Sequence, residues 1–247
     1  MTKEGILFFH QGWTDIINCL GLINYYCNLY DKIYLIMRED AKPILDFYTK
    51  DIKNVQMIYD KQHAIASTNG FTYVINKYSE LQLQEAELLG IGCVDIYRKD
   101  KFKDAFNRNT NSYFVNKFYE SYNISFNTRI SDFNFTRDKE LENSIYEKFI
   151  NTHGNEYILH HEIIQNYNHS KKIVNLNGIS DIFFDTIKVL ENALEIHLLD
   201  SVWAAFIYQL DAKYKLFQNK KIFLYAKRGH IRMFQEPIKL TNWIMAI

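Results

Sequence analysis

The chain begins with the segment GILFFHQGWTDIINCLGLI, residues 5–23, and this segment predicts how the first part of the protein folds. Its first five residues form a short apolar run of strand character, which His10, Gln11 and Gly12 then interrupt. From Ile16 onward, apolar residues recur at helical spacing. A strand, a loop and a helix are therefore expected in this order.

The same alternation of strand and helix continues along the first half of the chain. Strands are expected at 32–37 and 54–59, with a helix at 41–49 between them. Repeated strand-helix-strand order predicts parallel strands joined by right-handed crossovers. The later predictions in this half are a strand at 71–76, helices at 80–89 and 112–122, and an irregular connector at 124–135.

A second α/β series follows the connector. It predicts helices at 137–150, 184–193, 201–210 and 237–247, and strands at 156–160, 172–176, 194–199 and 221–225. The sequence therefore predicts an α/β protein with two Rossmann-like, doubly wound halves, residues 1–130 and 131–247, that face a cleft, and with a C-terminal helix.

Composition narrows the classes of partner. Lys and Arg number 29, as do Asp and Glu, so no overall field attracts nucleic acid or anionic lipid. The three cysteines are odd in number and widely spaced, which favours reduced thiols and a reducing compartment. No stretch reaches the roughly 18 apolar residues of a membrane span, and the start does not resemble a signal peptide. A cytoplasmic location is expected.

The first candidate site is the loop between the first strand and the first helix. Gly12 allows the backbone to approach a ligand closely, and Asp15 falls in the first helical turn, where the helix dipole favours an ionised carboxylate. Such a carboxylate can act as a general base, and His10 is the rival base. The alternative is that Asp15 only caps the helix and Gly12 only makes the turn.

The second candidate site is the segment IHLLDS, residues 196–201, a strand whose polar end begins a helix. Asp200 or Ser201 caps this helix, and the N–H groups behind them can bind an anion or a hydroxyl group. Plain capping without a ligand is the alternative interpretation.

The third candidate site is the loop that begins with His160 and His161 and ends at Lys171. These side chains could meet phosphate oxygens, and the basic segment at 220–232, which includes Arg228, supplies further positive charge. A solvated surface is the alternative. The histidines lack the spacing of a metal site on one helix face, and the chain has no Gly-x-Gly-x-x-Gly, no Walker loop, no Gly-x-Ser-x-Gly and no Asp-x-Asp. Neither a metal nor a cofactor is expected.

Taken in order, these motifs resemble those of the GT-B-fold glycosyltransferases, particularly the ADP-heptosyltransferase-like group. The resemblance is carried by the turn from Gly12 to Asp15, by Asp200 with Ser201, and by Glu191 in the helix before that strand. Thr14 and Val202 depart from the family, which usually has glycine at these two positions.

The resemblance implies an inverting, metal-independent transfer of a sugar from a nucleotide-sugar donor to a glycan or glycolipid acceptor. Asp15 would take the proton from the acceptor hydroxyl, with His10 as the rival. The residues expected to bind the donor are Gly12, His160, His161, Lys171, Glu191, Asp200, Ser201 and Arg228. A nucleotide-sugar epimerase or hydrolase, and a non-catalytic carbohydrate- or nucleotide-binding module, are the alternatives.

Overall fold

The structure is a computed structural model that describes residues 2–9, 12–60, 79–80, 85–91, 114–162, 170–225 and 240–246. The chain divides into two compact units, Met1–Phe135 and Thr136–Ile247. Each unit contains a parallel β-sheet and helices, which confirms the predicted α/β class with two parallel-sheet halves.

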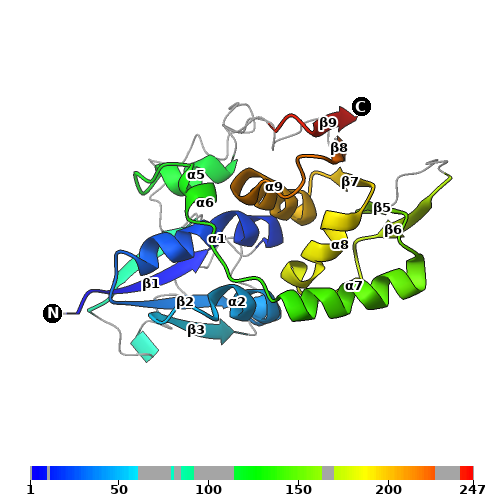
Figure 1. Ribbon diagram of the computed structural model, residues 1–247. Helices are drawn as coiled ribbons and strands as arrows, with labels where there is room; N and C mark the ends of the chain where they lie inside the picture. Colours follow the sequence, from blue (N-terminus) through cyan, green and yellow to red (C-terminus); the bar gives the residue numbers. More distant parts are fainter. Residues whose placement is uncertain are drawn as a thin grey trace. The chain divides into compact units, whose positions relative to one another are not determined.

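Unit 1 contains a four-stranded parallel sheet in the order β3-β2-β1-β4. Its elements are β1 (Glu4–Phe9), α1 (Trp13–Cys27), β2 (Lys32–Arg38), the 3-10 helix η1 (Glu39–Ala41), α2 (Lys42–Thr49), β3 (Val55–Asp60), β4 (Glu87–Ile91), α5 (Phe114–Glu120) and α6 (Thr128–Ser131). The helix α1 packs against β1 and β2, and α2 packs against β3, as Figure 1 shows.

The strands of unit 1 form because their apolar residues are buried on both faces of the sheet, as is usual for parallel strands. Five of the six residues of β1 are buried, as are the five central residues of β2. One face carries a cluster that includes Ile6, Phe8 and Ile36. The α1 helix packs very closely on α6, because a Cβ atom added at Gly21 would lie 2.7 Å from the Thr128 carbonyl oxygen.

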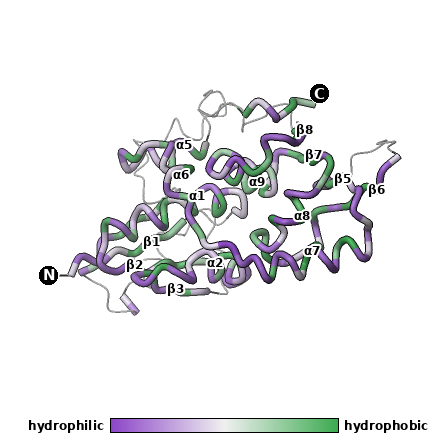
Figure 2. Tube along the Cα trace, in the orientation of Figure 1, coloured by the Kyte–Doolittle hydropathy of each residue, from purple (hydrophilic) through white to green (hydrophobic). Residues whose placement is uncertain are grey.

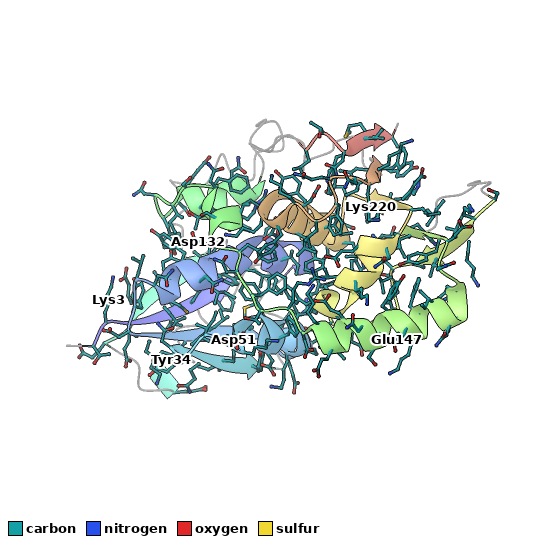
Figure 3. All side chains as sticks on the ribbon, in the orientation of Figure 1. Lys3, Tyr34, Asp51, Asp132, Glu147 and Lys220 are labelled. Atoms are coloured by element: carbon teal, nitrogen blue, oxygen red, sulfur yellow. The ribbon has the colours of Figure 1, made fainter. Side chains whose placement is uncertain are left out.

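The segment after α6 belongs to unit 1, beyond the boundary that was predicted after residue 130. Phe133 is fully buried and stacks on Tyr48 with ring centroids 5.8 Å apart. The Asn24 side-chain amide donates hydrogen bonds to the carbonyl oxygens of Asp132, at 2.8 Å, and Asn134, at 3.0 Å; Asp132 is labelled in Figure 3. These contacts hold the chain against α1 and α2 up to Phe135.

Unit 2 contains a five-stranded parallel sheet in the order β6-β5-β7-β8-β9. Its elements are α7 (Lys139–His153), β5 (Tyr157–His160), β6 (Lys172–Asn175), the 3-10 helix η3 (Phe183–Thr186), α8 (Ile187–Asn192), β7 (Glu195–Leu199), α9 (Val202–Tyr214), β8 (Lys221–Tyr225) and β9 (Trp243–Ala246). In Figure 2 the tube of α7 alternates between hydrophilic and hydrophobic colours, as expected for an amphipathic helix.

One face of this second sheet is covered by α7, α8 and α9. The Tyr157 ring packs edge-on against Phe149 of α7, with centroids 4.7 Å apart, and its hydroxyl donates to the Val189 carbonyl oxygen of α8 at 2.8 Å. Trp243 of β9 packs against Tyr208 of α9. Apolar side chains on this face, such as Tyr157 and Ile196, are therefore fully buried, although Met245 in the edge strand β9 is exposed.

A buried carboxylate joins the end of α9 to the last strand. Asp211 is fully buried and accepts hydrogen bonds from the Phe217 main-chain N–H at 3.0 Å, the Asn242 amide at 2.9 Å and the Trp243 indole N–H at 3.1 Å. Since one donor lies in the turn after α9 and the other two lie at the start of β9, this single side chain fixes both parts of the chain.

Three predicted elements differ from the structure. The helix predicted over 80–89 is wrong at its end, because Glu87–Ile91 is strand β4, paired with β1. The predicted terminal helix is wrong over Trp243–Ala246, which forms β9 beside β8. The predicted irregular connector contains the short helix α6. Short apolar runs fit either a helix or a strand, and here an open sheet edge selects the strand. The strand predicted over 71–76 lies outside the described residues.

Candidate functional site

The strand order of each sheet predicts a ligand-binding position at the carboxyl ends of two neighbouring strands, called the switch point below. In open parallel sheets, ligands bind beyond the carboxyl ends of two neighbouring strands from which the chain departs in opposite directions. In unit 1 the chain runs from β1 to β2 and β3 on one side, whereas β4 lies on the other side of β1. In unit 2 the corresponding position lies between β5 and β7. The first two candidate sites, and the beginning of the third, follow these strands.

Asp15 lies at the switch point of unit 1. The loop that leaves β1 ends at Gly12, the N-cap of α1, whose carbonyl oxygen accepts a hydrogen bond from the Ile16 N–H at 2.9 Å. Asp15 is the acidic residue of the first turn of α1 and is half-buried. An aspartate carboxylate at this position can accept a proton from a ligand hydroxyl. His10, the rival base, lies outside the described residues.

Arg38, which the sequence analysis did not single out, also lies at the carboxyl ends of the strands of unit 1. Arg38 is the last residue of β2, and its guanidinium lies over the Trp13 ring, 5.3 Å from the centroid. The Arg38 guanidinium also pairs with the Asp40 carboxylate. An arginine at the carboxyl end of a parallel strand was the available sequence signal, because that end faces the ligand edge.

The switch point of unit 2 brings together two of the predicted donor-binding residues. His161 directly follows β5 and Ser201 is the N-cap of α9, and the His161 Nδ1 atom lies 2.8 Å from the Ser201 Oγ atom. His161 is only 6 % exposed, and its main-chain N–H donates to the His197 carbonyl oxygen at 2.9 Å. This second bond ties the loop after β5 to β7.

The Ser201 side chain is directed to the imidazole and makes no capping hydrogen bond to α9. The first turn of α9 also contains no acidic residue. A helix begins with N–H groups that have no partner within the helix, and these groups and the helix dipole attract anions. The edge formed by Asp200, Ser201 and α9 therefore has the chemistry of a phosphate-binding position.

His160 lies at the end of β5, and a main-chain contact sets its tautomer. Its Nδ1 atom is 2.6 Å from the Glu162 carbonyl oxygen, which can only accept a hydrogen bond. Glu162 adopts a left-handed conformation with φ of 62°, which turns the chain back toward the imidazole. The Nδ1 atom therefore carries a hydrogen and is the donor in this contact.

Two other predicted donor-binding residues have partners elsewhere. Lys171 pairs with Glu156, and these residues precede β6 and β5, so this exposed pair stands at the amino ends of the strands, opposite the switch point. In α8, both Glu191 carboxylate oxygens accept from Arg137, at 2.6 and 2.9 Å. Burial lowers the pKa of Arg137, but hydrogen bonds to Glu142 and Glu191 outweigh it and raise that pKa overall. Neither Lys171 nor Glu191 joins the His161 and Ser201 group.

The basic segment at 220–232 is described only at its start. Lys220, labelled in Figure 3, precedes β8 and donates to the Ala193 carbonyl oxygen at 2.5 Å. Burial lowers the pKa of this lysine, and Glu191 acts in the opposite direction. It therefore also lies at the amino-end edge of the sheet. Arg228 lies outside the described residues.

Among the described residues, no three His, Cys, Asp or Glu side chains are grouped so that they could hold a metal ion. In the same part of the chain, none of the helices has the length and apolar character needed to cross a bilayer.

The fold and the two switch points define a class of protein with two Rossmann-like units. No protein-family profile matches the chain, and no curated protein matches it significantly. Solved structures do match. The crystal structure of the glycosyl transferase family 9 protein from Veillonella parvula DSM 2008 is 12 % identical, with a TM-score of 0.57 over 99 % of this chain and 86 % of that one.

The E. coli heptosyltransferase WaaC with ADP-2-deoxy-2-fluoro heptose is 10 % identical to this chain, with a TM-score of 0.44. That match covers 98 % of this chain and 92 % of the WaaC chain. The likeness to the Veillonella protein confirms the fold that the predicted resemblance implies, an α/β protein with two parallel-sheet halves.

Proposed function

We propose that this protein is a glycosyltransferase that moves a sugar from a nucleoside-diphosphate donor to an acceptor hydroxyl group. The observation that carries the proposal is the group at the switch point of unit 2. There a buried imidazole holds the N-cap hydroxyl of Ser201, and the amino end of α9 stands beside it. The fold supports the same proposal, because the solved structure that it resembles is described as a glycosyl transferase.

In this proposal the diphosphate binds at the edge formed by His161, Asp200, Ser201 and the first turn of α9. As the bond to the sugar breaks, negative charge grows on the diphosphate, and the α9 N–H groups and dipole stabilise this charge. No metal is needed for that role. Arg228 and Lys171 are the proposed additional cations, with Lys171 the weaker candidate because it pairs with Glu156.

Asp15 is the proposed general base on the acceptor side. As the acceptor hydroxyl attacks the anomeric carbon and the bond from that carbon to the diphosphate breaks, the hydroxyl proton passes to the Asp15 carboxylate. A single displacement of this kind inverts the configuration at the anomeric carbon. A glycan or glycolipid acceptor and a cytoplasmic location belong to the same proposal.

The test is a thermal-shift panel of ADP, GDP, CDP and UDP and of sugars linked to these diphosphates, without added metal. A ligand that binds only the folded protein raises its melting temperature. At least one nucleoside diphosphate should stabilise the protein, and Ser201→Ala and His161→Phe should weaken that effect, whereas the exposed Leu29→Ala should not. If no compound in the panel shifts the melting temperature, the proposed function is wrong.

A donor hydrolase is the second candidate, and the short contact between His161 and Ser201 favours it. A hydroxyl group that donates to an imidazole is the usual arrangement of an activated nucleophile. Product analysis separates the two functions. A transferase converts the donor mainly when an acceptor sugar is present, whereas a hydrolase releases free sugar at the same rate without it.

A further inference from the structure

A row of three hydrogen-bonded side chains crosses the sheet of unit 2 beside the proposed donor site. The Glu195 Oε2 atom lies 3.3 Å from the His197 Nε2 atom, and the His197 Nδ1 atom lies 2.8 Å from the Tyr225 hydroxyl. Glu195 and His197 belong to β7, and Tyr225 is the last residue of the neighbouring strand β8. The proposed mechanism uses none of these three groups.

The row lies on the face of the sheet opposite the one that packs against α7, α8 and α9. Residues that alternate along a strand point to opposite faces, and Tyr157, Ile196 and Leu224 occupy the packed face. On the other face, His197 pairs in register with His160 of β5 and with Phe223 of β8. Phe223 and Tyr225 are half-buried there, whereas His197 is only 1 % exposed, so of the row's two ring side chains Tyr225 is the one that keeps some exposed surface.

Tyr225 is the last residue of β8 and stands at the carboxyl end of the sheet. Tyr225 begins at the carboxyl end of β8, opposite Leu199 in register, but its side chain leans across to His197 in the neighbouring strand. Its ring stacks on the imidazole with centroids 5.8 Å apart. Leu199 is the last residue of β7 and precedes Ser201 by two positions, so Tyr225 stands one strand away from the strand end that leads to the proposed donor site.

The carboxylate sets the direction of every hydrogen bond in the row. A carboxylate only accepts, so the neutral imidazole carries its hydrogen on Nε2, and its Nδ1 atom accepts from the Tyr225 hydroxyl. Burial, and then the charge of Glu195, raise the pKa of Tyr225, so the phenol keeps its proton. The Tyr225 oxygen is therefore left with acceptor capacity and no hydrogen to donate to a ligand.

We propose that Tyr225 is a specificity-determining residue whose oxygen accepts a hydrogen bond from an N–H or O–H group of the bound nucleoside diphosphate, and that His197 and Glu195 position it. This inference rests on the proposed function. Two groups of such a ligand have the required chemistry: an exocyclic amine of the base and a hydroxyl of the ribose. This row of three side chains discriminates against a ligand that presents only a hydrogen-bond acceptor to the Tyr225 oxygen.

The first experiment measures dissociation constants of the best-bound nucleoside diphosphate by calorimetry at about pH 8, where an ordinary histidine is neutral. Tyr225→Phe removes one oxygen atom and keeps the ring, so affinity should fall roughly tenfold, as for the loss of one hydrogen bond. The matched control is Tyr157→Phe, which removes a tyrosine hydroxyl bound to the Val189 carbonyl on the opposite face. That change should lower the melting temperature and leave affinity unchanged.

Ligand analogues then identify the donating group. The 2′-deoxy and 3′-deoxy forms of the same nucleotide each lack one ribose hydroxyl, and the analogue without the exocyclic amine lacks the base donor. The analogue that lacks the donating group should bind the natural protein about tenfold more weakly than the parent nucleotide does. That analogue should bind the natural protein and Tyr225→Phe with equal affinity, because the hydrogen bond is absent in both complexes.

Substitutions at the two positioning residues separate this role from simple packing. His197→Asn keeps an oxygen that can accept from Tyr225 and should retain the preference among analogues, whereas His197→Phe should lose it. Glu195→Gln can donate to Nε2, which reverses the row and turns the Tyr225 hydrogen outward, so the preference should also be lost.

Two negative results have different meanings. If the natural protein binds no nucleoside diphosphate, the proposed function fails, and this inference fails with it. If the protein binds one but Tyr225→Phe matches the natural affinity, or every analogue keeps its full penalty in Tyr225→Phe, only the role of Tyr225 is overturned.

Discussion

At the scale of single residues, Asp15 and Ser201 show how one local pattern gives two different sites. Each follows a parallel strand and lies at the beginning of a long helix. Asp15 brings a negative charge to the first turn of α1, whereas α9 begins with a hydroxyl and no acid. Because the α9 dipole is not offset by a carboxylate in its first turn, the amino end of α9 suits an anion, and that of α1 suits a proton acceptor.

We expect Asp15→Asn to fold normally and to lower turnover by about two decades or more, the size of a typical general-base loss. The asparagine keeps the shape of the side chain and cannot take a proton. The measurement is turnover at saturating donor and acceptor, with circular dichroism and the donor dissociation constant as checks on folding and binding. Near-normal turnover would remove Asp15 from the mechanism.

At the scale of the elements, Asp211 is the side chain on which the end of unit 2 depends. We expect Asp211→Ala to lower the free energy of unfolding by about 3 kcal/mol, because three buried donors lose a charged acceptor. Asp138→Ala is the matched control: its carboxylate accepts only the Leu141 N–H at the exposed start of α7, so the loss should be about 1 kcal/mol. Urea denaturation measures both, and equal losses would refute the assigned role of Asp211.

The sequence predicted the bounds of an element correctly where its apolar residues alternate regularly or where polar residues mark its end. The strand at 221–225 has the bounds that were predicted, and the helix after Ser201 begins where the polar end of IHLLDS predicts it. It predicted a helix wrongly where a short apolar run pairs with the edge strand of a sheet. Trp243 shows why, because its strand pairs with β8 and its indole binds Asp211, more than 30 residues away in sequence. No local pattern contains that partner.

For the candidate site, the sequence predicted the strand-to-helix turns but not which side chains meet there. The strand-to-helix turns at Asp15 and Ser201 could be found because capping residues follow apolar strands. The contact between His161 and Ser201 depends on β5 and β7 being neighbours, which strand order alone determines. For the same reason the sequence did not reveal that Lys171 stands at the opposite edge, or that His197 reaches Tyr225.

At the scale of the whole molecule, stability should depend on pH through His153. Burial, and then the nearby charge of Lys172, lower the pKa of this histidine. Its Nδ1 atom is buried and has no hydrogen-bond partner among the described residues. The unfolded chain therefore binds a proton more readily than the folded one, so stability is lost as pH falls through the ordinary histidine range near 6.5.

We expect His153→Asn to reduce this loss. The measurement is the melting temperature of the two proteins between about pH 8 and pH 5, with the difference between them taken at each pH. Their curves should approach each other as pH falls. Parallel curves over the whole range would show that His153 does not contribute.

The two units occupy uninterrupted stretches of sequence, and the chain passes from one to the other between Phe135 and Thr136. A single crossover in the gene at this point would therefore exchange one complete sheet with its helices and leave the other intact. Recombination between distant relatives could in this way combine the first unit of one protein with the second unit of another.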